Sequence, residues 1–106
     1  MIGRAEEAAH AKPLHKPKRF GIILMPTVLR FGSMRFEIHL RNEHEPPHVH
    51  VDLPDGEVVV VLDELNGTVS VRDKDRDVRA VDVARTVMIV TQHFDVLLEL
   101  WSYYHR

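Results

Sequence analysis

The sequence contains no cysteine, which excludes a disulfide framework, a thiolate metal site and a cysteine nucleophile. Long apolar runs are missing too. The run from Phe20 to Met25 is too short for a signal-peptide core, and Pro26 follows it in place of a small-residue cleavage site. No segment approaches the roughly 18 apolar residues that a membrane-spanning helix needs. We therefore expect a cytoplasmic protein without membrane association.

A large excess of charge of one sign is also absent, since the net charge is -2 over 106 residues. Residues 1–24 contain five basic and two acidic side chains, which leaves -5 on the remainder of the chain. An acidic body does not by itself attract a phosphate backbone, whereas the basic stretch could contact nucleic acid or an acidic partner. Short charged tails are, however, usually just solvated.

The N-terminal stretch differs from the rest of the chain in its pattern as well. Residues 1–19 have no sustained period of 2 or of 3.6, and a strand pattern starts only after Met25. We expect a flexible basic leader at 1–24, of which residues 1–19 contribute little to stability, and then a single α+β domain at 25–106. Met25 is accordingly a candidate for the natural start.

Alternation of apolar and polar residues predicts an antiparallel meander of about five strands. Gly32-Ser33, Pro54-Asp55-Gly56 and Asn66-Gly67 are turn signals between them. The fourth segment is rich in valine on both faces, which is typical of a central strand. The expected strands are 27–31, 34–41, 48–53, 57–65 and 68–72.

After a charged connection at 72–79, apolar residues repeat at intervals of four and three, which predicts one long C-terminal helix packed on the sheet. Asp82 is a plausible N-cap. Trp101 lies late on the apolar stripe, so we expect it to anchor the end of the helix. The stripe consists of Val83, Val87, Val90, Phe94, Leu97, Trp101 and Tyr104.

The segment from His44 to Asp52 is unusually rich in histidine. In a strand, residues two apart point the same way, so His48, His50 and Asp52 share the face opposite the valines. Antiparallel pairing with the preceding strand then brings His39 beside His48 or His50, with Glu37 nearby. Several ionisable groups should therefore meet on one patch.

Three interpretations of this patch follow. Imidazole and carboxylate groups can bind zinc or another divalent metal, for which the candidate ligands are His39, His48, His50 and Asp52. Histidine can also act as a general acid or base in RNA cleavage, for which the candidates are His44, His48 and His50, with Arg30 stabilising negative charge. In the third interpretation the patch is the solvated face of an antiparallel sheet.

Glu57 also follows this histidine pair, in an arrangement similar to the cupin metal motif. The glutamate lies too far along the sequence for that motif, and the chain lacks the strands of a full cupin barrel. We therefore leave Glu57 out of the predicted ligand set.

The chain resembles a bacterial family known as domain of unknown function 4160. The resemblance rests on the segment from Met25 to Arg30, the strand with Arg35, the block from His44 to His50 and the helix ending near Trp101. Glu43 stands where the family usually has aspartate. The resemblance implies strands followed by a helix.

The resemblance also implies a genetic context. Members are often encoded beside a second small domain, domain of unknown function 2442, in pairs that look like toxin–antitoxin modules. We therefore expect a component of a toxin–antitoxin-like pair that acts on RNA or on a small protein partner. The alternative is a non-catalytic binding module with a histidine-rich metal-binding or interaction face.

Overall fold

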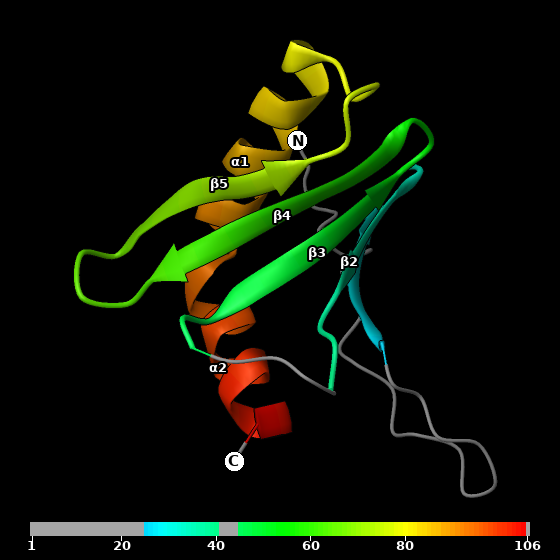
Figure 1. The fold of residues 1–106 in the computed structure, drawn as a ribbon. Coiled ribbons are helices and arrows are strands. Elements are labelled where there is room, and N and C mark those ends of the chain that lie inside the picture. The colour runs from blue at the N-terminus through cyan, green and yellow to red at the C-terminus, as the bar shows by residue number, and fades with distance from the viewer. Residues whose placement is uncertain (1–24, 41–44, 106) are drawn as a thin grey trace, which may run out of the picture.

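The computed structural model describes residues 25–40 and 45–105, so the predictions on the leader and on His44 lie outside the described residues. A five-stranded antiparallel sheet, in which the strands lie side by side in chain order, is followed by two helices (Figure 1). The predicted α+β class and the strand meander are confirmed. The elements are β1 Thr27–Phe31, β2 Met34–Glu37, β3 His48–Leu53, β4 Gly56–Asp63, β5 Thr68–Lys74, α1 Ala80–Gln92 and α2 Phe94–His105.

The prediction of one long C-terminal helix is wrong, because His93 separates α1 from α2. His93 has φ -115° and ψ 23°, outside the helical region. Its ring Nδ1 lies 2.9 Å from the carbonyl oxygen of Ile89, and its backbone N–H is shared between the carbonyls of Ile89 and Val90. The side chain thus competes with the backbone N–H for the Ile89 carbonyl, which in an uninterrupted helix accepts a bond from the backbone only. A one-residue interruption hardly shifts the apolar stripe, so the sequence pattern does not reveal it.

The start of α1 also differs from the prediction. The helix begins at Ala80 with Arg79 at the N-cap, and Asp82 lies in the first turn. The carboxylate of Asp82 lies 3.4 Å from Arg79 Nε and 3.7 Å from Arg85 Nη1. Asp82 therefore favours the helix through its charge near the N-terminus. None of the helices in the described ranges combines the length and apolarity needed to cross a membrane.

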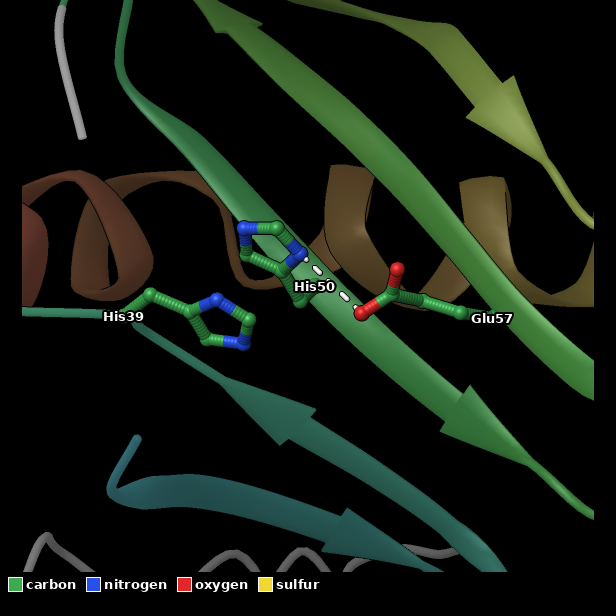
Figure 2. Close-up of side chains that lie close together, drawn as sticks. All are labelled: His39, His50 and Glu57. Atoms are coloured by element: carbon green, nitrogen blue, oxygen red, sulfur yellow. Dashed lines mark hydrogen bonds and ion pairs between the residues drawn. The ribbon is translucent and has the colours of Figure 1, made fainter. Parts of the chain in front are cut away.

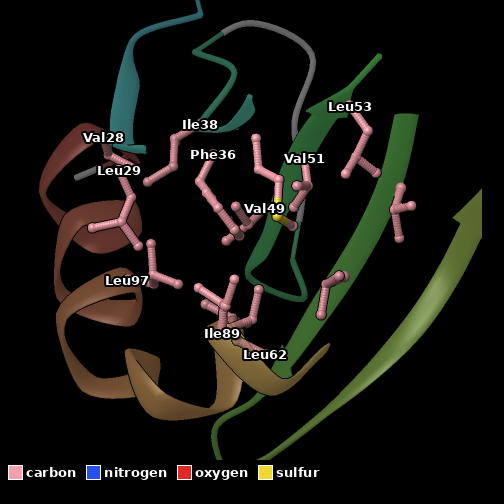
Figure 3. Close-up of a cluster of buried hydrophobic side chains, with 14 of the residues drawn as sticks. Val28, Leu29, Phe36, Ile38, Val49, Val51, Leu53, Leu62, Ile89 and Leu97 are labelled. Atoms are coloured by element: carbon pink, nitrogen blue, oxygen red, sulfur yellow. The ribbon is translucent and has the colours of Figure 1, made fainter. Parts of the chain in front are cut away.

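One face of the sheet forms the core with the helices (Figure 3). Phe36 lies opposite Val51, and Val51 lies opposite Val58, so these side chains point the same way from β2, β3 and β4. All three are fully buried and belong to the same cluster as Leu97 and Trp101 from α2. The predicted burial of Trp101 is confirmed, since it is 5% exposed.

The other face of the sheet carries the polar residues in cross-strand rows. One row consists of Arg30, Arg35, Asp52 and Glu57, which lie opposite one another on β1 to β4. The next row contains Glu37, His50 and Val59. Alternation along each strand therefore places the candidate functional residues on the face turned away from the helices.

Candidate functional site

Three side chains meet on this face: His39 from the segment after β2, His50 from β3 and Glu57 from β4 (Figure 2). His50 projects from the middle of β3, and Glu57 lies near the start of β4. His39 comes two residues after the end of β2. One potential ligand atom from each residue lies within 4.8 Å of the other two.

The contacts within this trio are specific. His50 Nδ1 lies 3.1 Å from Glu57 Oε2. The rings of His39 and His50 stack with centroids 3.5 Å apart and an interplanar angle of 3°. Potential ligand atoms of both rings and of the Glu57 carboxylate thus lie close enough together to share a single cation.

His48 and His50 are buried, with exposed fractions of 2% and 8%. This burial contradicts the interpretation of the patch as a plain solvated face. His48 Nδ1 lies 2.9 Å from the carbonyl oxygen of Pro46, and its ring meets that of His50 edge-on at 5.2 Å. His48 therefore lies beside the trio, where one of its ring nitrogens is engaged by the backbone.

The end of α2 lies next to His48 and to the backbone of His39. The rings of Trp101 and His105 stack at 4.1 Å, and Trp101 lies 6.4 Å from the ring of His48. His105 Nε2 in turn lies 2.9 Å from the carbonyl oxygen of His39. The segment that carries His39 is thus held by the last turn of α2.

Glu37 supplies further negative charge to the site. It lies opposite His50 in the sheet, and its Oε1 is 3.7 Å from His39 Nε2. Burial raises the pKa of Glu37 above its usual 4.5, and the carboxylates of Asp52 and Glu57 raise it further. Arg35 and His50 act in the opposite direction.

This pKa shift predicts a pH-dependent stability difference between the wild type and Glu37→Gln. Because the folded pKa lies above 4.5, the charged carboxylate destabilises the fold at neutral pH, and this penalty is relieved as the pH falls through the folded pKa. The wild type should therefore gain stability relative to Glu37→Gln between pH 7 and pH 4.5. Urea unfolding of both proteins across this range measures the difference, and a constant difference would contradict the shift.

The remaining predicted residues lie apart from the trio. Asp52 forms an ion pair with Arg35, so its carboxylate is already engaged by a guanidinium group. Arg30 is exposed on β1, and β2 separates it from the histidines of β3. The structure thus brings together His39, His48 and His50 from the predicted set, but Asp52 faces Arg35 and Arg30 lies two strands away.

Sequence reasoning missed Glu57, although the signal was present. The Pro54-Asp55 turn places Leu53 opposite Gly56 and Asp52 opposite Glu57. Glu57 therefore shares a face with His50 and lies diagonally across from it. His50 and Glu57 are seven residues apart in the sequence because the turn between β3 and β4 lies between them. The residue spacing of the cupin motif, which belongs to a different fold, was therefore the wrong criterion for leaving Glu57 out of the ligand set.

The trio provides two imidazoles and a carboxylate, which is a donor set that zinc and related divalent metals accept. Tetrahedral zinc brings such donors to about 3.3 Å from one another. Stacked rings direct their lone pairs in parallel, so coordination by both histidines requires one ring to turn. We expect the His39 ring to make this turn, because His39 lies beyond the end of β2, whereas β3 holds His50 between two strands.

Comparisons with known proteins identify the family but not an activity. A family model described as Domain of unknown function (DUF4160) matches residues 34–102, a range that runs from β2 into α2. No curated protein and no solved structure shows a significant match. The matched range contains all three residues of the trio, and the chain belongs to the DUF4160 family.

Proposed function

We propose that the protein is a metal-binding module that holds a divalent transition metal such as zinc through His39, His50 and Glu57. The convergence of three potential ligand atoms within 4.8 Å supports this proposal. Glu57 is 42% exposed at its side chain, whereas His50 is 11% exposed. A metal ion arriving from solvent therefore meets the carboxylate first and then the imidazoles.

Glu37 supports the same proposal as a residue that would contact a histidine ligand and not the metal itself. Histidine ligands usually donate their remaining N–H to a carboxylate or carbonyl, which fixes the tautomer and orients the ring. Glu37 Oε1 lies 3.7 Å from His39 Nε2, beyond hydrogen-bond distance, so Glu37 takes this role only once the His39 ring has turned. The carboxylates of Glu37 and Glu57 offset the charge of a divalent ion, because histidine ligands bind a metal in their neutral form.

The proposal predicts a rise in melting temperature with metal. A metal ion that binds only the native state stabilises it by about 1.4 kcal/mol at a free concentration ten times the Kd. For a domain of this size the gain corresponds to about 6 °C or more. Melting curves with zinc, nickel, manganese or a chelator at pH 8 measure it. At pH 5.5 the shift should shrink, because protons compete for both imidazoles, whose ordinary pKa is about 6.5.

Paired variants separate the trio from the ligands predicted by sequence alone. Glu57→Gln and His50→Gln should lose most of the metal-induced shift, whereas Asp52→Asn should keep it because Asp52 already pairs with Arg35. Glu64→Gln, in the exposed turn after β4, is the matched carboxylate control. A wild type whose midpoint no metal moves, or a shift lost in Asp52→Asn but kept in Glu57→Gln, would refute the proposed site.

Family membership motivates a second proposal, in which the chain is one component of a toxin–antitoxin-like pair that acts on RNA or on a small protein partner, such as a domain of unknown function 2442. The contact of His48 with the Pro46 carbonyl guides its test. If His48 has a catalytic role, inducing the chain alone should arrest bacterial growth, and both His48→Ala and His48→Asn should relieve the arrest. Relief by alanine alone would indicate loss of fold, because asparagine can retain a hydrogen bond to Pro46.

A further inference from the structure

The face of the helices turned away from the sheet carries an apolar seam. Four large apolar side chains on α1 and α2 are about half exposed, namely Val81 (59%), Met88 (51%), Val96 (45%) and Tyr103 (53%). The positions between them along the seam are occupied by Arg85, Gln92 and Glu99, all exposed. The seven residues follow one another at intervals of 4, 3, 4, 4, 3 and 4, which keeps them on one side of α1 and on one side of α2. The bonds from the His93 N–H to the Ile89 carbonyl and from the Leu97 N–H to the His93 carbonyl continue the helical pattern across His93.

This order of intervals reads the same in both directions, with Gln92 at its centre. Two copies of the seam placed antiparallel about a two-fold axis at Gln92 would bring Met88 against Val96 of the other copy. The same arrangement places Val81 against Tyr103. Apolar residues therefore meet apolar residues at every apolar position of the seam.

The polar positions of the seam are complementary in the same arrangement. Arg85 would face Glu99 of the second copy, so the two-fold axis creates two ion pairs of opposite charge. Gln92 would face itself, and an amide can both donate and accept a hydrogen bond. The side chain of Arg85 is 60% exposed, with its Nη1 3.7 Å from Asp82 Oδ1, so it remains accessible to a partner.

We infer that the outer face of α1 and α2 is a homodimer interface in which the helices of two copies pack antiparallel. The inference is independent of the proposed metal site, which lies on the opposite side of the sheet. A parallel arrangement is disfavoured, because an axis parallel to the helices would place Arg85 against Arg85 and Glu99 against Glu99. Charge thus selects the antiparallel pairing.

Charge reversal tests both the dimer and its register. The wild type should elute in size-exclusion chromatography with light scattering at twice its chain mass of 12.3 kDa. Arg85→Glu and Glu99→Arg each place like charges together twice, and each should raise the dimer Kd at least about tenfold. The double variant should restore the dimer. An equimolar mixture of the two single variants should also dimerise, because both ion pairs form between unlike copies.

Two further measurements keep the test decisive. Arg76→Glu, in the exposed connection after β5, is the charge-matched control and should leave the dimer unchanged. Circular dichroism should show the same helix content in all variants, which separates dissociation from unfolding. A wild type that stays monomeric up to millimolar concentration would overturn the interface. A dimer that the single reversals leave intact, or that the double variant does not restore, would overturn it as well.

Discussion

Trp101→Ala should lower the free energy of unfolding by about 3 to 5 kcal/mol, as expected for removal of a fully buried tryptophan side chain. Trp101 is 5% exposed and belongs to the same buried cluster as residues of β2, β3 and β4. It also stacks on His105, which contacts the backbone of His39. The substitution therefore leaves a large cavity and releases the end of α2 from the sheet.

Urea unfolding followed by circular dichroism measures this loss. Leu65→Ala is the control, since Leu65 is 96% exposed and should lose less than about 0.5 kcal/mol. Trp101 is the single tryptophan of the chain, so native fluorescence reports on it alone. A native emission maximum typical of tryptophan in water, or a loss no larger than that of the control, would show that the indole does not anchor α2.

Gly56→Ala should cost about 2 to 4 kcal/mol, because two effects add. Gly56 has φ +141°, a conformation that side chains rarely adopt. A Cβ at this position would also lie 2.7 Å from Cβ of Asp75 and 2.8 Å from its Oδ2. That oxygen accepts a hydrogen bond from the backbone N–H of Glu57, so moving Asp75 aside breaks the bond.

Gly67→Ala provides the matched control for this effect. Gly67 has φ +68°, but no atom lies within 4 Å of the position its Cβ would occupy. Its substitution should therefore cost only the backbone term, about 1 kcal/mol. Thermal unfolding of the two variants compares them directly. Equal losses would mean that Asp75 moves at no cost, and that its bond to Glu57 contributes little to stability.

The strands could be predicted from sequence because their signals are local. β1 begins and ends at the predicted residues, and alternation of side chains placed β3 correctly. β2 was predicted to reach residue 41 but ends at Glu37. Ile38, the residue after β2, is still fully buried. The alternation of apolar and polar residues therefore continues past the point where the strand pairing ends. The hairpin predicted at Asn66-Gly67 is present, but β4 ends at Asp63 in place of residue 65, so its loop has four residues, 64–67.

The site was predictable only in part because its members depend on strand register. Alternation alone placed His48, His50 and Asp52 on one face, and pairing with the preceding strand brought in His39. The choice between Asp52 and Glu57 as neighbour of the histidines depends on Arg35, which lies opposite Asp52. The break at His93 depends on a single side chain competing for a carbonyl, which a pattern spanning many residues does not register.

The alternation of side chains along β3 determines which of its residues can be substituted without disturbing the core. Val49 and Val51 belong to the core, whereas His50 and Asp52, which alternate with them along β3, face the polar rows. Substitutions at His50, Asp52 and Glu57 thus change the functional groups on the polar face of the sheet without creating a cavity beneath the helices. These positions form a natural set for a combinatorial library, in which ligand specificity is selected while the hydrophobic half of the same strands keeps the scaffold folded.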